Sequence, residues 1–258
     1  MIRQVLWITL FMLCPLAASS ALVGGAGPAD PDGMARYVVL VVGSHGTSCT
    51  GTAIARNLVL TAAHCVLPGS EYRWVEFDRD HRATLKKLAE VVPHPRFDLH
   101  ALLSHRATAD IAVLKPAEDL SDDIMAVALA PSDRMIGVGD RFTVVGYGVS
   151  VRGDGRSGGT IRAAVLTTTG QPGPLQIRLV DPSTADTRAG LGACSGDSGA
   201  PVFVSDAGQV GMIGLVSWST GPGGTEGCGG LTGVTPLGRY RDWILETAKK
   251  LGATLTPG

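Results

Sequence analysis

Three short segments of the 258-residue sequence carry side chains whose types could act together in covalent catalysis. His64 lies in the segment TAAHC, Asp110 stands directly before the apolar run IAVL, and Ser198 lies in CSGDSGAP. A serine hydroxyl is a weak nucleophile that needs a neighbouring base, and a neutral imidazole is suited to take its proton. A carboxylate can hold that imidazole in the required tautomer. If the fold brings them together, these side chains predict attack of a serine on a carbonyl carbon.

The elements that must position these side chains have the pattern of short β-strands. Short apolar runs rich in Val and Ile alternate with Gly-rich and Pro-rich turns, which is typical of barrels or a sandwich. The runs are Tyr37–Val42, Leu58–Ala62, Ile111–Leu114, Phe142–Val145, Ile177–Val180, Pro201–Val204 and Met212–Trp218. Leu237–Leu251 differs, because its apolar residues fall at helical spacing and Gly252 follows, so it predicts one amphipathic helix.

Composition and charge exclude several classes of protein. The 22 Lys and Arg residues balance 23 Asp and Glu residues, so the net charge of −1 leaves no basic surface for nucleic acid. Hydrophobic residues make up 45% of the chain and charged residues only 17%, which excludes a disordered protein. We find no repeat and no linker long enough to separate independent domains.

Residues 1–21 have the pattern of a signal peptide. Arg3 precedes the apolar run Val5–Leu13, and small residues up to Ala21 suit signal peptidase. The apolar run is shorter than the roughly 20 residues that a membrane span needs. We therefore predict an exported protein, secreted to the extracellular space or the periplasm, without stable insertion in a membrane.

The cysteines that follow the predicted signal peptide are Cys49, Cys65, Cys194 and Cys228. An even number in an exported chain predicts two disulfides, and their spacing alone leaves three pairings open. A metal site is the alternative, but no Cys-x-x-Cys pair or paired histidine spacing supports it. We therefore expect no metal.

The order and spacing of the three chemical segments point to a known family. His64 precedes Asp110 by 46 residues, and Asp110 precedes Ser198 by 88. In this order the chain resembles the chymotrypsin/trypsin-like serine endopeptidases, over essentially everything after residue 21. Further family landmarks match in sequence order: Val23-Gly24-Gly25, Cys49-Thr50-Gly51-Thr52, His94-Pro95, Gly146-Tyr147-Gly148, Ser217-Trp218 and Tyr240-x-x-Trp243-Ile244.

The resemblance implies an all-β fold of two packed antiparallel six-stranded β-barrels with a C-terminal α-helix. The protease domain would cover residues 22–258. Its first barrel would span about residues 22–125, its second about 126–236, and the helix 237–251. Substrate would lie in the cleft between the barrels, where each barrel supplies part of the site.

The resemblance also implies a role for each chemical residue. Ser198 would attack the substrate carbonyl, His64 would act as base and then as acid, and Asp110 would orient the imidazole. Backbone N–H groups of Gly196 and Ser198 would form the oxyanion hole. The chain would thus be a secreted serine endopeptidase without a cofactor, acting as a monomer on protein or peptide substrates. Protein inhibitors of proteases would be further partners.

The disulfides and the substrate pocket follow from the same resemblance. The implied bridges are Cys49–Cys65 and Cys194–Cys228. The implied pocket residues are Gly192, Ala193, Ser217, Trp218, Ser219 and, with one residue of register left open, Gly233. Trypsin-like members carry an Asp at the pocket floor for Arg or Lys, whereas Gly192 leaves this floor uncharged.

We predict that this pocket prefers an uncharged residue before the scissile bond, medium or large and apolar. One alternative stays open. Glu226, in the expanded Gly221–Gly227 loop, could turn toward the pocket and accept a basic side chain. A solvent-exposed loop acid is the interpretation that we favour, because a flexible charge at a rim gains little from being ordered.

Members of this family become active when a new N-terminal amine pairs with the acid just before the nucleophile. Here the ion pair would join Leu22 and Asp197. Ala21 stands where Arg or Lys usually precedes the cut, so we expect signal peptidase alone to expose Leu22. The alternative is a cut after Ala18 that leaves Ser19–Ala21 as a short propeptide.

A catalytically silent binding module on the same fold is the alternative function. A pure binder would not require His64, Asp110, Ser198, Gly196 and Asp197 all to be intact, so the enzyme is favoured. An α/β-hydrolase esterase would need a Gly-x-Ser-x-Gly elbow and the order Ser, Asp, His, which this chain lacks.

Overall fold

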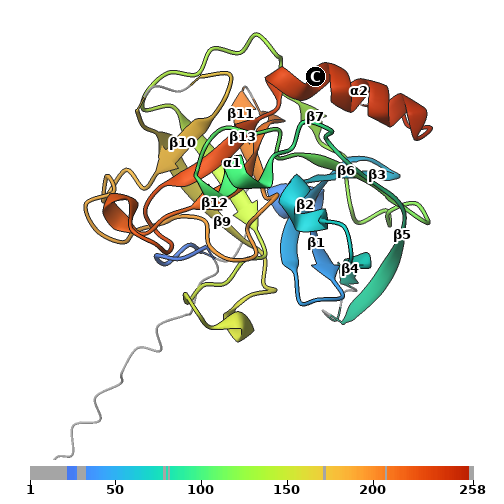
Figure 1. Ribbon diagram of the computed structural model, residues 1–258, viewed down its shortest axis with the longest axis horizontal. Coiled ribbons are helices and arrows are strands. Elements are labelled where there is room, and N and C mark those ends of the chain that lie inside the picture. Colours follow the sequence, from blue (N-terminus) through green and yellow to red (C-terminus); the bar gives the residue numbers. More distant parts are fainter. Residues whose placement is uncertain are drawn as a thin grey trace, which may run out of the picture.

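The computed structural model describes residues 22–27, 33–77, 80, 82–170, 173–206 and 208–255. The signal peptide predicted over residues 1–21 lies outside this range. The described chain forms two β-barrels that lie side by side, with a helix near the C-terminal end (Figure 1). The predicted fold of two six-stranded barrels with a C-terminal helix is therefore confirmed.

The first barrel is a closed ring of six strands in the order β1-β2-β3-β6-β5-β4. Its strands are β1 (Val38–Gly43), β2 (Ser48–Ala55), β3 (Leu58–Thr61), β4 (Tyr72–Phe77), β5 (Ala83–Pro93) and β6 (Ala112–Pro116). All six neighbouring pairs run antiparallel. The ring has no open edge, so its backbone hydrogen bonds are made within the barrel.

The second barrel is a closed ring in the order β11-β8-β9-β10-β13-β12, completed by pairing of β11 with β12. Its strands are β8 (Arg141–Gly146), β9 (Arg162–Thr168), β10 (Ile177–Val180), β11 (Pro201–Asp206), β12 (Gln209–Ser219) and β13 (Thr232–Pro236). The two-residue strand β7 (Ala128–Leu129) lies outside the ring and runs parallel to β12. This short parallel pairing is the one departure from the antiparallel pattern among the described strands.

Strand β3 shows why polar and apolar residues do not alternate along these strands. Leu58 and Leu60 belong to a cluster shared with Phe203 and Met212 of the second barrel, while Val59 points into the first barrel. Because side chains alternate along a strand, both faces of β3 are covered. Each fully buried Val or Leu of this kind stabilises the fold by about 1.5–3 kcal/mol. The same packing holds the barrels at a fixed separation, which any site between them requires.

The helices are few and short. They are η1 (Met34–Tyr37), η2 (Ala63–Val66), α1 (Leu99–Leu103), η3 (Gly155–Ser157), η4 (Pro222–Gly224), η5 (Gly238–Tyr240) and α2 (Arg241–Lys250), where η marks a 3₁₀ turn. Helix α2 packs Ile244 and Ala248 into the cluster between the barrels. The helix predicted over 237–251 is thus α2 with one 3₁₀ turn before it.

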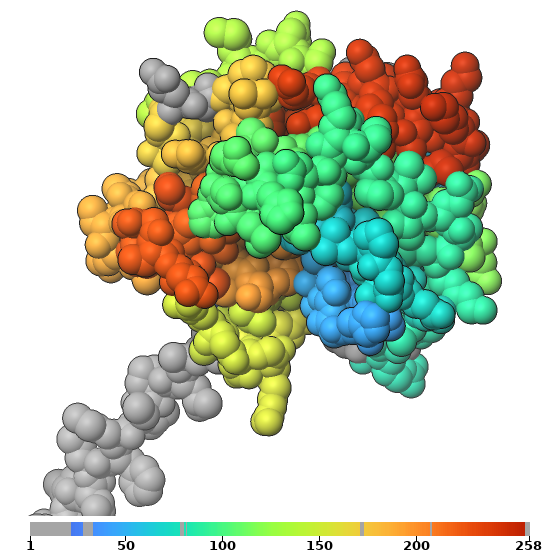
Figure 2. Space-filling model, viewed as in Figure 1, coloured from blue at the N-terminus to red at the C-terminus, as the bar shows by residue number. Residues whose placement is uncertain are grey.

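Loops from both barrels meet on one face of the molecule. Figure 2 shows the green segment that contains α1 beside the orange-red segment after β12. Nearby, the ring of His105 stacks on the ring of Trp218, near the end of β12, with centroids 4.6 Å apart. In the described part of the chain, no helix is long and apolar enough to cross a membrane.

Candidate active site

The side chain of His64 is held by Asp110. His64 lies in η2 directly after β3, and Asp110 lies just before β6, the strand that pairs with β3. His64 Nδ1 is 2.8 Å from Asp110 Oδ2, and the His64 backbone N–H donates to Oδ1 at 3.0 Å. An ionised carboxylate can only accept, so Nδ1 carries the proton and Nε2 of a neutral ring is an acceptor.

The Asp110 carboxylate is fully buried but well supplied with donors. Ser217 Oγ of β12 donates to Oδ2 at 2.6 Å, in addition to the two donors from His64. Burying a charge is costly unless donors replace the lost water, and three donors do so here. Because Ser217 belongs to the second barrel, this bond also ties the two barrels together at the site.

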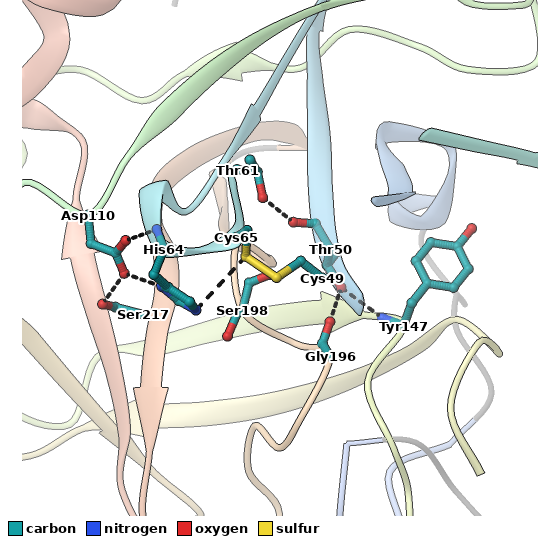
Figure 3. Close-up of a disulfide and its surroundings, with 10 residues drawn as sticks. All are labelled: Cys49, Thr50, Thr61, His64, Cys65, Asp110, Tyr147, Gly196, Ser198 and Ser217. Atoms are coloured by element: carbon teal, nitrogen blue, oxygen red, sulfur yellow. Dashed lines mark hydrogen bonds and ion pairs between the residues drawn. A yellow bond between two sulfur atoms is a disulfide. The ribbon is translucent and has the colours of Figure 1, made fainter. Parts of the chain in front are cut away.

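The backbone of Ser198 is tied to the first barrel. The Thr50 N–H of β2 donates to the Ser198 carbonyl oxygen at 2.8 Å. Cys65 Sγ lies 3.7 Å from this oxygen and 3.9 Å from His64 Nε2, so the histidine and the serine flank the same sulfur atom. Figure 3 shows His64 between Asp110 and Ser198. The three side chains predicted from the sequence therefore come from distant segments to one place.

Two glycines allow the Ser198 loop to pack this closely. Gly199 has φ +78°, and a Cβ atom there would lie 2.3 Å from the Thr50 carbonyl oxygen. Gly196 has φ +95°, and its Cβ would lie 2.8 Å from Gly148 Cα. Only glycine fits such left-handed, crowded positions without strain. The GxSG pattern is thus required by geometry on both sides of the serine.

The peptide between Ser195 and Gly196 has a defined orientation. The Ser195 carbonyl accepts from Val149 N–H at 2.8 Å. In a planar trans peptide the carbonyl and the N–H point in opposite directions, so the Gly196 N–H faces away from Val149. Among the described residues, this N–H donates no hydrogen bond.

Asp197 is fully buried beneath this loop, with two backbone donors. Gly148 N–H and Cys194 N–H donate to its two oxygens, each at 2.9 Å. Burial raises the pKa of this carboxyl to about 7, and the two hydrogen bonds offset part of that effect. A side chain at Gly148 would collide with the carboxylate, because the Cβ would lie 2.4 Å from it. Asp197 is thus a buried acid that lacks a cationic partner in the described chain.

The segment after residue 21 is docked into the second barrel. Leu22 is fully buried, Val23 pairs with Gly192 in an antiparallel bridge, and Gly24 lies against the Gly190 carbonyl. In the full-length chain the Leu22 nitrogen is a peptide amide, because Ala21 precedes it. A free amine at Leu22 exists only after cleavage.

The predicted pocket residues lie around the end of β12, with one shift of register. Ser219 pairs with Thr232, and Trp218 pairs with Gly233. A Cβ at Gly233 would lie 2.0 Å from the Trp218 ring, so Gly233 packs beneath the indole. Thr232 instead lies beside the predicted floor, where its Oγ1 accepts from Ala193 N–H at 3.0 Å. The sequence left the register open by one residue, and in the structure Thr232 rather than Gly233 contacts Ala193.

Little space surrounds Gly192, which was predicted to form the pocket floor. Gly192, Ala193 and Thr232 are all buried, and a Cβ at Gly192 would lie 3.2 Å from Gly229 Cα and 3.5 Å from Thr232 Oγ1. Glu226 is not at the floor: its side chain is 99% exposed and lies 4.0 Å from Arg152 at the rim. An exposed pair of this kind contributes little energy.

Other histidines and cysteines near the site serve packing. His94 packs against Tyr240 and Trp243, with centroids 5.2 and 4.7 Å away, and burial lowers its pKa. Among the described residues, the one cluster with metal-ligand spacing is Cys49, His64 and Cys65. Its cysteines are joined as a disulfide, so they offer no thiolate. The predicted bridges Cys49–Cys65 and Cys194–Cys228 are both confirmed.

Comparison with known proteins decides the family. A family model described as trypsin matches residues 23–244. The chain belongs to the trypsin family. The vitellin-degrading protease of Bombyx mori is 28% identical over 93% of this chain and 94% of its own length. Dog chymase is 26% identical over 95% of this chain and 97% of its own. Human kallikrein-11 is 28% identical over 78% and 72%.

Family membership makes this chain a serine-type endopeptidase, a hydrolase of proteins. Two residues at its site were not found by sequence reasoning. Thr232 was missed because the register of β12 and β13 shifts between Val216 and Trp218. The Thr50 side chain was missed because its partners lie 97 and 146 residues away in the sequence. Neither the register shift nor the hydrogen bonds of Thr50 can be recognised from the sequence without the fold.

Proposed function

We propose that this trypsin-family protein is a secreted endopeptidase that cleaves peptide bonds through Ser198, His64 and Asp110. The observation that carries the proposal is the chain of contacts from Ser217 through the buried Asp110 carboxylate to His64 Nδ1. It leaves Nε2 of His64 as an acceptor on the side of Ser198. A histidine in that state is suited to take the serine proton.

The reaction would proceed in two halves. Ser198 Oγ attacks the substrate carbonyl while its proton passes to His64 Nε2, and the same proton then goes to the leaving amine. Water repeats the sequence on the acyl-enzyme and releases the second product. Asp110 stays ionised and stabilises the imidazolium. Gly196 and Ser198 N–H groups would bind the oxygen as it becomes negative.

The substrate pocket would accept a small, uncharged side chain before the scissile bond. The floor at Gly192 has no charge to pair with Arg or Lys, and leaving a buried cation unpaired is costly. Thr232 and Gly229 also crowd the space above the floor. We therefore keep the predicted preference for an uncharged residue but replace the predicted medium or large apolar side chain by a small one, such as that of Ala, Val or Thr. The backbone of Ser217–Ser219 would pair with the peptide as an added strand.

Activation would depend on a new amine at Leu22. Its segment is docked beside the pocket through Val23 and Gly24. The buried Asp197 carboxylate would then gain a cationic partner. Ala21 suits signal peptidase, so export alone would produce the active form. N-terminal sequencing of active secreted protein tests this, and any start other than Leu22 contradicts the direct route.

Location and partners follow from the same proposal. The predicted signal peptide would direct the protein to the extracellular space or the periplasm. There it would act as a monomer, and protein inhibitors of proteases would bind at the same cleft as substrates.

Cleavage of a peptide library tests the proposal. Purified protein starting at Leu22 is compared with Ser198→Ala and with Ser205→Ala, an exposed serine at the end of β11. We expect cleavage after small uncharged residues, a loss of about 10⁶ in kcat for Ser198→Ala, and no change for the control. Cleavage after Arg or Lys would contradict the pocket and point to Glu226. No cleavage by the Leu22 form would leave the catalytically silent binding module.

A further inference from the structure

The hydroxyl of Thr50 bridges two segments of the second barrel from a position in the first. Thr50 lies in β2 and is fully buried. Its Oγ1 donates to the Gly196 carbonyl at 2.8 Å and accepts from Tyr147 N–H at 3.0 Å (Figure 3). Because a threonine hydroxyl offers one donor, the direction of both bonds is determined.

The backbone of Thr50 extends the same contact. Its N–H donates to the Ser198 carbonyl at 2.8 Å, and its carbonyl accepts from Thr61 Oγ1 at 2.8 Å. Thr50 thus touches the loop on both sides of Asp197. The Thr52 hydroxyl differs, although it lies two residues away on β2 and is equally buried. It has no hydrogen-bond partner.

The bond to Thr50 restrains the peptide plane that follows Gly196. The plane before Gly196 is held by Val149 N–H, which binds the Ser195 carbonyl. The plane after it is held by Thr50 at its carbonyl and by the Cys194 carbonyl at its N–H, 3.0 Å away. Glycine rotates freely about φ and ψ, so the φ of +95° depends on these restraints.

We propose that Thr50 is a positioning residue of the oxyanion hole, through which the first barrel sets the direction of the Gly196 N–H. This inference rests on the proposed function of the site. Without the hydroxyl, the buried Tyr147 N–H and the partly buried Gly196 carbonyl lose their partner, which favours rotation of the loop. The rotated loop no longer aims the Gly196 N–H at the oxygen that becomes negative in the transition state.

The test compares Thr50→Val, which keeps the shape but removes the hydroxyl, with Thr50→Ser and Thr52→Val. For Thr50→Val we expect kcat to fall about 10-fold to 100-fold, less than the 10²–10³ lost with a whole donor, while KM changes less than about 3-fold. Affinity for a peptidyl trifluoromethyl ketone, whose serine adduct carries the oxyanion, should fall by the same factor as kcat. Thr50→Ser should recover most of the activity, and Thr52→Val should match the wild type.

Three results would overturn the inference. One is a lower melting temperature for Thr50→Val with unchanged kcat, since that is a structural role alone. Another is a change in KM without a change in kcat. If Thr50→Val does not fold, Thr50→Ala and Thr50→Ser decide, and equal kcat values for the two contradict the role of the hydroxyl. A wild-type protein that neither cleaves peptides nor binds the ketone contradicts the proposed function instead.

Discussion

The two halves of the site are held by different means. On the first-barrel side, His64 and Asp110 contact each other through side chains placed next to paired strands, and a disulfide follows His64 directly. On the second-barrel side, Gly196 and Ser198 lie in a loop held by backbone hydrogen bonds to other segments. The first half takes one donor from the second barrel, the Ser217 hydroxyl on Asp110, whereas the second half is restrained through its backbone by Thr50 and Val149.

The second half also contains Asp197, whose pKa burial raises to about 7 and which has no cationic partner among the described residues. Under the proposed activation, a free amine at Leu22 would supply that partner. Variants that affect one half and not the other test whether the two halves are held independently.

The largest effect is expected in the first half. Asp110→Asn keeps the shape but replaces a carboxylate that accepts three hydrogen bonds. The amide allows the wrong tautomer of His64, so kcat should fall by about 10⁴ while the fold is kept. Steady-state kinetics measure the loss. Asp122→Asn, at an exposed ion pair with Arg56, is the control. Full activity of Asp110→Asn would contradict the proposed triad.

The next effect concerns the second half and the start of the chain. Protein beginning at Ser19 should be about 10²–10³ less active than protein beginning at Leu22, because without the amine the oxyanion loop loses its order. In the Leu22 form the amine must be charged. Pairing raises its pKa above the usual value near 8, so activity should persist below that region and fail as pH rises through the raised value. A flat rate up to about pH 11 would contradict the ion pair.

The forms that begin at Ser19 and at Leu22 should also differ in how their stability depends on pH. In the uncut form, the folded Asp197 keeps its proton up to about pH 7, whereas the unfolded acid loses it near pH 4. Folding therefore binds a proton in this window, and the stability of the uncut form should fall as pH rises from about 4 to about 7, by about 4 kcal/mol at most. Melting temperatures of the Ser19 and Leu22 forms should diverge across this interval. If Asp197→Asn in the Ser19 form keeps the same slope, another group is responsible.

The smallest effect concerns the choice of substrate. Thr232→Gly removes the side chain that reaches the floor beside Ala193, so cleavage after Phe or Leu relative to Ala should rise about 10-fold or more. Ratios of kcat/KM for matched peptides give the answer. Gly233→Ala is no substitute, because it would collide with Trp218. An unchanged ratio in Thr232→Gly would place the size limit elsewhere, for example at Ser219.

Much of the secondary structure could be predicted because the strands share one local pattern. Short apolar runs bounded by Gly and Pro indicated the strands, and the spacing before Gly252 indicated the last helix. The helix begins later than predicted, at Arg241 instead of Leu237, because a 3₁₀ turn precedes it. The short parallel pairing of β7 with β12 was not expected, since a two-residue strand leaves no pattern to find.

The candidate catalytic residues could be found without the fold, because the GDSG segment, the histidine before a cysteine and the acid before a strand are local patterns. The uncharged residue Gly192, predicted at the pocket floor, could also be found in this way. The tertiary structure was needed to show that Thr232 contacts Ala193 while Gly233 packs beneath Trp218, and that the Thr50 hydroxyl holds Gly196. The physical reason is that a β-bulge changes which residues face each other, and that a hydrogen bond across 146 residues depends on how two barrels pack.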